Sequence, residues 1–155
     1  MINNLSMKQL RQAANGVILT LLAACTSAAS AAPIVMYRDA GCGCCLKWAN
    51  HAETNMDREI TVKDEASMAA RKSKLGVPSM LASCHTAIID GYIIEGHVPA
   101  ADIKRLLETR PAGVAGLAVP GMPVGSPGME YENRTQPYEV IAFGESGLSV
   151  FSRHN

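Results

Sequence analysis

Three of the chain's five cysteines fall within four consecutive positions of the stretch Asp39-Ala40-Gly41-Cys42-Gly43-Cys44-Cys45-Leu46-Lys47-Trp48. Residues 34–37, just before it, are apolar and rich in β-forming side chains, a pattern that predicts a buried strand. From residue 44 to residue 55 the apolar residues recur at helical spacing. The cysteines are therefore expected in a loop between a strand and the N-terminus of a helix.

The pattern up to residue 110 is that of an α/β domain. After the first helix come segments typical of a strand, a helix, a β-hairpin and a helix, at residues 60–64, 65–75, 86–97 and 99–110. Asp90-Gly91 marks the hairpin, because this dipeptide is a strong two-residue turn signal. Arg110 ends the last helix, because the residue before a proline is pushed out of the helical region. The order of the elements predicts a thioredoxin-like mixed sheet with flanking helices.

The composition changes after the last predicted helix. Residues 111–128 include nine glycines and prolines among eighteen residues and predict an irregular loop. Two apolar segments, residues 138–143 and 148–151, predict a second β-hairpin. A two-stranded unit is rarely stable alone, so this C-terminal part is expected to pack on the same domain. Residues 32–155 are thus predicted to form a single thioredoxin-like domain.

Residues 1–31 have the form of a secretory signal peptide. Lys8 and Arg11 precede a short apolar run, which cannot cross a bilayer because a membrane helix needs ~20 apolar residues. Two modes of signal-peptide processing fit the small residues that follow. One is ordinary cleavage near Ala32, and the other is lipidation of Cys25 at the end of a lipobox-like Leu-Ala-Ala-Cys. The mature chain is therefore expected in the periplasm, lipid-anchored if Cys25 is a true lipobox cysteine, and without a transmembrane segment.

Charge and composition narrow the classes of partner. The chain has 14 basic and 14 acidic residues, and no basic stripe interleaves with aromatic side chains, which argues against nucleic acid as a partner. No Ser-His-Asp set, phosphate-binding loop or pair of carboxylates stands out. In an oxidising compartment, free thiols persist only if a metal or a reductant holds them. The cysteines are therefore the residues whose chemistry needs an explanation.

The cysteine-rich loop has the pattern C-x-C-C. Cys42 and Cys45 alone form a C-x-x-C pair where thioredoxin-like redox pairs sit, and a helix N-terminus lowers the pKa of a thiol. Cys44 adds a third thiol, which invites wrong pairings in a disulfide exchanger but suits a soft metal, copper(I) above all. Gly41 and Gly43 let the loop bend tightly. The motif therefore predicts a copper site, with a plain disulfide and one further thiol as the alternative.

A second Cys-His pair comes from another part of the chain. Cys84 and His85 immediately precede a predicted strand, and in a thioredoxin-like fold the loop that enters this strand faces the cysteine-rich loop. Both are therefore expected beside the motif cysteines. In the alternatives, Cys84 forms a structural disulfide with a loop cysteine and His85 is a surface turn residue. His97, at the start of a helix, is either a ligand or a histidine hydrogen-bonded to the backbone.

Methionines and the remaining histidines are weaker candidates. Met122 and Met129 lie in the Gly/Pro-rich loop, where their thioethers suit copper(I), although such side chains also fill gaps over a core. His51 lies seven residues after Cys44, ~10 Å further along the helix, and is too distant to share one ion with it. His154, next to the last residue, is expected to be disordered.

Several blocks, spread over the whole predicted mature chain, resemble the CopG-type periplasmic copper-resistance proteins. They are Cys42-Gly-Cys-Cys45, Leu75-Gly-Val-Pro78, Ser83-Cys-His-Thr86, Glu95-Gly-His-Val-Pro-Ala-Ala-Asp-Ile103 and residues 116–129. The resemblance implies a thioredoxin-like fold whose C-x-C-C loop binds copper(I) or copper(II), with several ions in a multinuclear cluster and a copper oxidoreductase role in resistance. The partners it implies are copper ions and other periplasmic copper-handling proteins.

Position by position, the resemblance assigns metal binding to the motif cysteines and the Cys-His pair, and it matches three further family positions. The complete set of predicted metal ligands is Cys42, Cys44, Cys45, Cys84, His85, His97, Met122 and Met129. Two other hypotheses stay open. One is thiol-disulfide exchange by Cys42 and Cys45, which would survive Cys44→Ala. The other is a structural zinc site of three cysteines and His85, closed and tetrahedral.

Overall fold

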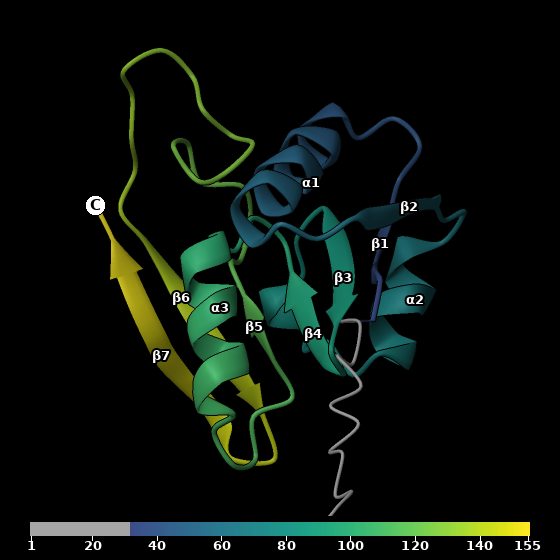
Figure 1. Cartoon of the computed structure of the whole chain (residues 1–155), viewed down its shortest axis with the longest axis vertical. Helices are drawn as coiled ribbons and strands as arrows, with labels where there is room; N and C mark the ends of the chain where they lie inside the picture. The colour runs from purple at the N-terminus through teal and green to yellow at the C-terminus, as the bar shows by residue number, and fades with distance from the viewer. Residues whose placement is uncertain (1–31) are drawn as a thin grey trace, which may run out of the picture. The chain divides into compact units, whose positions relative to one another are not determined.

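The computed structural model describes residues 32–155 of the chain (Figure 1). In chain order its elements are β1 (Ile34–Arg38), α1 (Gly43–Met56), β2 (Ile60–Asp64), α2 (Met68–Lys74), the 3-10 helix η1 (Ser79–Leu81), β3 (His85–Ile89), β4 (Tyr92–Glu95), α3 (Ala100–Thr109), β5 (Gly116–Ala118), β6 (Tyr138–Gly144) and β7 (Gly147–His154). The predicted signal peptide and its lipobox at Cys25 lie outside the described residues. No helix in residues 32–155 is long and apolar enough to cross a membrane.

The seven strands form one mixed sheet in the order β2-β1-β3-β4-β5-β6-β7. β1 is parallel to β2 and β4 is parallel to β5, whereas all other neighbours are antiparallel. The predicted α/β class, with a mixed sheet and flanking helices, is confirmed. The register of β1 against β3 pairs Arg38 with His85. The end of β1, which leads into the cysteine-rich loop, therefore lies beside the start of β3, which follows Cys84.

The C-terminal part extends this sheet and does not form a separate unit (Figure 1). The predicted second hairpin, β6–β7, is confirmed, but the expectation of irregular structure throughout residues 111–128 is wrong because this segment contributes β5. Gly116 begins β5 with no room for a side chain, since a Cβ there would lie 2.0 Å from the Ile93 carbonyl oxygen. The expectation for His154 is also wrong: it ends β7, with Nε2 2.7 Å from Asp102 Oδ2.

Apolar side chains pack on both faces of the sheet. Successive strand residues point to opposite faces, and in β4 Ile94 belongs to a cluster under α1 and α3 while Ile93 belongs to a second cluster with Leu81 of η1. Trp48 of α1 is fully buried in the first cluster, and its Nε1 donates to the Val98 carbonyl oxygen at 2.9 Å. The indole thereby fixes the first turns of α1, which carry the cysteines, against the segment that leads into α3.

Candidate metal centre

Arg38 at the end of β1 fixes the backbone of the cysteine-rich loop. Its Nη1 donates to the carbonyl oxygens of Ala40 at 3.1 Å and Cys42 at 3.0 Å, and its Nη2 forms an ion pair with Asp64 at 3.0 Å. Cys42 then caps the N-terminus of α1, so that Cys44 and Cys45 lie in the first helical turn. The strand-loop-helix placement expected from the sequence is confirmed.

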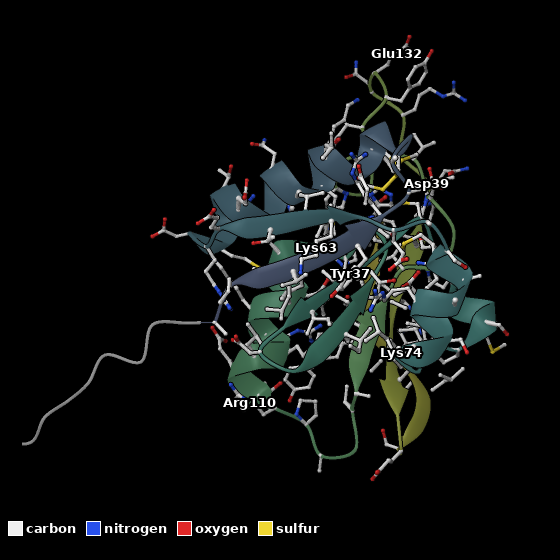
Figure 2. All side chains as sticks on the ribbon, turned by 90° about the vertical axis from the view of Figure 1, so that its right-hand side faces the viewer. Tyr37, Asp39, Lys63, Lys74, Arg110 and Glu132 are labelled. Atoms are coloured by element: carbon white, nitrogen blue, oxygen red, sulfur yellow. A yellow bond between two sulfur atoms is a disulfide. The ribbon has the colours of Figure 1, made fainter. Side chains whose placement is uncertain are left out.

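Four sulfur atoms converge at this end of α1. Cys42 and Cys45 form a disulfide, visible in Figure 2 as the yellow bond beside Asp39. Cys44 and Cys84 are free, and the Cys44 sulfur lies 3.5 Å from that of Cys42 and 3.9 Å from that of Cys84. From the sequence, the alternative to a metal site is a plain disulfide with one further thiol. The disulfide is present in this state of the loop, but two free thiols lie near it. A disulfide between Cys84 and a loop cysteine is excluded in this state.

Two histidines complete a second group of donor atoms, which shares Cys84 with the first. The Cys84 sulfur lies 3.0 Å from His97 Nε2 and 3.4 Å from His85 Nδ1, and both imidazoles are fully buried. His85 is therefore not a surface turn residue. His97 Nδ1 donates to the Pro127 carbonyl oxygen at 2.8 Å, which leaves the Nε2 lone pair directed at Cys84. Such a backbone partner orients histidines that bind metals.

The environment keeps these imidazoles in the neutral form that binds metals. Burial lowers the pKa of His85 well below its ordinary value, and the nearby His97 and Lys72 add to the effect. Burial also lowers the pKa of His97, although the Pro127 carbonyl opposes this. His85 directs Nδ1 at Cys84, whereas its Nε2 is buried with no hydrogen-bond partner, a costly arrangement for a polar atom. The donor set therefore fits a metal ion.

The thiol of Cys84 is held protonated by its surroundings in the absence of metal. Burial raises the pKa of Cys84 to about 12, and the neighbouring Cys44 contributes to the shift. A bound cation reverses this preference, because a coordinating thiol loses its proton outright. Metal binding at Cys84 therefore releases a proton, and alkaline conditions favour it over acidic ones.

The predicted methionine ligands lie in the loop between β5 and β6. This loop passes beside α1 (Figure 1), and the labelled Glu132 marks its outer end in Figure 2. Met122 is 52% exposed and Met129 is partly buried. The loop is tied to the site through Gly121, whose carbonyl oxygen accepts a hydrogen bond from Ser83 Oγ. Among the described residues, His51 belongs to neither donor group, as its spacing predicted.

We expect the stability of the metal-free chain to fall below pH ~6.5. His85 and His97 have lowered pKa values when folded, so the unfolded chain binds protons first as the pH decreases. Their contribution is complete above pH ~6.5 and is lost as the pH falls from there towards their folded pKa values, by up to about 1.4 kcal/mol per pH unit for each histidine. Urea unfolding between pH ~7 and ~5 measures this slope. A His85→Gln variant with the same slope as the parent chain would contradict the assignment to His85.

Residues that position the donors carried no signal in the sequence. The backbone carbonyl of Pro127 and the side chain of Arg38 were not predicted, and neither was the buried ion pair of Lys72 and Glu95 at 2.5 Å. Lys72 sits among other basic residues of α2, which is the usual pattern of a solvated helix face.

The fold and the site together define a mixed α/β protein with a Cys/His cluster able to hold a metal ion. The chain belongs to the CopG copper resistance protein family. It is 50% identical to two solved structures described as copper resistance protein CopG, form 1 and form 2. The alignment covers 81% and 80% of this chain and 98% and 100% of the solved chains, with TM-scores of 0.75 and 0.74.

A family model agrees with this assignment. Residues 81–129 match the family described as "Protein of unknown function, DUF411". The matched range includes Cys84, His85, His97 and both loop methionines, but it begins after the C-x-C-C motif. No curated protein matches the chain.

Proposed function

We propose that this protein binds copper ions at the cluster of Cys42, Cys44, Cys45, Cys84, His85 and His97, as part of copper resistance. The observation that carries the proposal is the position of Cys84, whose sulfur lies 3.9 Å from Cys44 Sγ and 3.0 Å from His97 Nε2. One thiol thus joins the thiolate loop to two neutral imidazoles. Thiolates select copper(I), and imidazole suits both oxidation states of copper. The names of the two solved relatives support copper as the metal.

The arrangement supports more than one copper ion per chain. The four sulfurs form one group of potential ligands, and Cys84, His85 and His97 form another. Because Cys84 belongs to both, its thiolate would bridge neighbouring ions in a multinuclear cluster. Met122 and Met129 are proposed as thioether donors to the same copper ions, because the loop that carries them is hydrogen-bonded to Ser83 beside Cys84.

Reduction of the disulfide sets the number of available donors. With Cys42 and Cys45 joined, only Cys44 and Cys84 offer thiolates, whereas the reduced chain offers four. We therefore assign full copper loading to the reduced form. Oxidation of this pair releases two electrons, which is the number needed to convert two copper(II) ions to copper(I), so the site has the means for copper redox activity.

We infer that the first four strands and the three α-helices form a thioredoxin-like domain. The support is the chain order strand-helix-strand-helix-hairpin-helix, with β1 parallel to β2, and antiparallel pairs β1–β3 and β3–β4. The cysteine-rich loop between β1 and α1 also has the position of thioredoxin-like redox pairs. β5, β6 and β7 extend the sheet beyond this unit.

A periplasmic location is proposed from the first 31 residues of the sequence and from the disulfide. Lys8 and Arg11, followed by a short apolar run, fit an export signal, and disulfides persist in oxidising compartments. If Cys25 is a true lipobox cysteine, the exported chain is anchored to a membrane by a lipid. Other periplasmic copper-handling proteins are the partners proposed for delivery and removal of the ions.

The disulfide itself favours a second candidate function. Cys42 and Cys45 are joined at the N-terminus of α1, where the helix lowers the pKa of a reduced thiol and promotes exchange with other thiols. A thiol-disulfide oxidoreductase would use only this pair. Cys44, 3.5 Å from the sulfur of Cys42, would then compete with Cys45 for the disulfide.

Anaerobic titration with copper(I) tests the proposed function. The reduced chain is expected to take up more than one ion in competition with bathocuproine disulfonate, with ultraviolet absorption from thiolate-to-copper charge transfer. The chain with Cys42 and Cys45 oxidised is expected to bind fewer ions. If the reduced chain leaves all copper(I) with the chelator, it is not a copper-binding protein.

Cys44→Ala separates the two candidate functions. Loss of copper(I) binding with unchanged catalysis of insulin disulfide reduction would mean that the two activities depend on different cysteines. A copper site predicts that copper(I) binding weakens and that fewer ions are bound, because Cys44 is one of the four sulfurs and its Sγ lies 3.9 Å from that of Cys84. An exchange enzyme predicts that disulfide reduction survives in this variant, and a parent chain without any such activity eliminates the second candidate.

A further inference from the structure

Glu95 at the end of β4 is a fully buried carboxylate that neither donor group includes. Its Oε1 lies 2.5 Å from Lys72 Nζ and accepts the backbone N–H of Ser83 at 2.6 Å. Its Oε2 accepts the hydroxyl of Thr86 at 2.6 Å. Both carboxylate oxygens are therefore committed to partners from three different segments of the chain.

Two of these partners flank the Cys84-His85 pair. Ser83 immediately precedes Cys84, and Thr86 immediately follows His85, so one carboxylate binds the chain on both sides of two donors. Thr86 is also paired with Glu95 in the β3–β4 register. The Ser83 amide has no helix or strand partner, because it lies between η1 and β3. Glu95 thus connects the segment before Cys84 to strand β4 through a hydrogen bond.

The third donor of this group is carried by the same strand end. His97 follows Glu95 by two residues, and the intervening Gly96 donates its N–H to the His85 carbonyl oxygen at 2.9 Å. A side chain at position 95 that holds Ser83 and Thr86 therefore also sets how β3 lies against the segment with His97. The separation of 3.0 Å between Cys84 Sγ and His97 Nε2 depends on that alignment.

Lys72 compensates, through its ammonium group, for the burial of the negatively charged Glu95 carboxylate. Its Nζ contacts both Glu95 Oε1 and Thr86 Oγ1, at 2.5 Å and 3.0 Å, and its side chain is 9% exposed. A buried ion pair is weak evidence for a stabilising role, because desolvation offsets most of the attraction and apolar replacements are often tolerated. Here the ion pair matters because it keeps the Glu95 side chain in place as the acceptor for the Ser83 amide and the Thr86 hydroxyl.

We propose that Glu95 is a positioning residue of the metal centre, which holds Cys84 and His85 at the distances from Cys44 and His97 that copper binding requires. The inference rests on the proposed copper-binding function. Without the acceptor at position 95, the Ser83 amide loses its only partner, and the turn that carries Cys84 is no longer fixed to β4. Copper(I) then binds to donors that must first be ordered.

Two double variants that differ only at position 95 test this role. Lys72→Met with Glu95→Leu removes both charges and both acceptor oxygens. Lys72→Met with Glu95→Gln also removes both charges, but it keeps one oxygen that accepts the Ser83 amide and an NH2 group that can donate to Thr86 Oγ1 in place of Lys72. The leucine pair is expected to weaken copper(I) binding by about 10- to 100-fold in competition with bathocuproine disulfonate. The glutamine pair is expected to stay within about threefold of the parent chain.

Amide exchange of the metal-free chain, followed by NMR, is the second readout. The Ser83 amide is expected to exchange at least about tenfold faster in the leucine pair than in the glutamine pair, because only the first has lost the acceptor. Amides of β1 and β2 serve as the internal control for overall stability. Equal copper(I) affinities or equal Ser83 exchange in two folded variants would overturn the proposal.

Two further outcomes are distinguishable. If the parent chain binds no copper(I), the proposed function is wrong. Amide exchange of Ser83 then still shows whether Glu95 fixes this segment. If the leucine pair does not fold, Thr86→Val is compared with Thr86→Ser, because only the first removes the hydroxyl that donates to Glu95. The valine variant is expected to bind copper(I) several-fold more weakly than the serine variant, and equal affinities would again overturn the proposal.

Discussion

Cys84→Ser is expected to lower the affinity for copper(I) by more than about 100-fold, the upper end of what loss of an outer hydrogen-bonding partner costs a metal site. The reason is that, within residues 32–155, Cys84 is the one residue that belongs to both donor groups. Its sulfur is the one that approaches Cys44 on one side and both imidazoles on the other. A serine hydroxyl keeps the size of the side chain but is a poor ligand for a soft ion. The number of bound ions is also expected to fall.

Two variants that each affect one group are the controls for Cys84→Ser. Cys44→Ser removes a sulfur from the first group only, and His97→Gln removes an imidazole from the second only. Each is expected to weaken binding less than Cys84→Ser does, when all three are measured by chelator competition on the reduced chain. A Cys84→Ser variant that binds copper(I) as well as Cys44→Ser would show that Cys84 does not join the two groups.

Gly128→Ala is expected to lower the free energy of unfolding by about 2 to 5 kcal/mol. Gly128 has φ +84°, in the left-handed region, and its missing side chain lets the loop touch α1. A Cβ there would lie 2.7 Å from the Trp48 nitrogen and 2.8 Å from the Cys44 carbonyl oxygen, both of them backbone atoms that cannot rotate away. The loop must therefore shift away from α1. Urea unfolding of the reduced, metal-free chain measures the loss.

The same substitution should also weaken copper(I) binding, because Pro127 is the neighbour of Gly128 and its carbonyl orients His97. Gly121→Ala is the matched control in the same loop. Gly121 also has a positive φ, +70°, but nothing lies within 4 Å of the Cβ that would be added. The only expected cost there is that of placing an alanine in the left-handed backbone region, about 1 to 2 kcal/mol. Equal destabilisation by the two substitutions would mean that contact with α1 contributes nothing.

Much of the fold could be predicted because its elements are local. The helical spacing after Cys44, the Asp90-Gly91 turn and the proline after Arg110 each determine structure within a few residues, and all three were confirmed. β5 could not be predicted in this way. Three residues that begin with Gly116 have no strand pattern of their own, and they are a strand only because β4 and β6 lie on either side. Such pairing depends on context more than on sequence.

The sequence identified those site residues whose side chains are uncommon in proteins, but not those whose side chains are common. Cysteines and a Cys-His pair are unusual enough to identify, and the end of β1 and the start of β3 meet in an antiparallel pair, which brings them together. Lys72 and Glu95 are ordinary charged residues, 23 positions apart, whose burial shows only in three dimensions. The position of His154 depends likewise on Asp102, a contact between β7 and α3 that no local pattern contains.

The proposed function requires that thiolates and imidazoles of one cluster hold the copper ions. X-ray absorption at the copper edge, on reduced chain loaded anaerobically with copper(I), measures the neighbours of the ion directly. Sulfur is expected as the main neighbour, with a smaller contribution from imidazole nitrogen that decreases in His97→Gln. A spectrum with only oxygen and nitrogen neighbours, or one that is unchanged when Cys84 is replaced by serine, would rule out copper binding by this cluster.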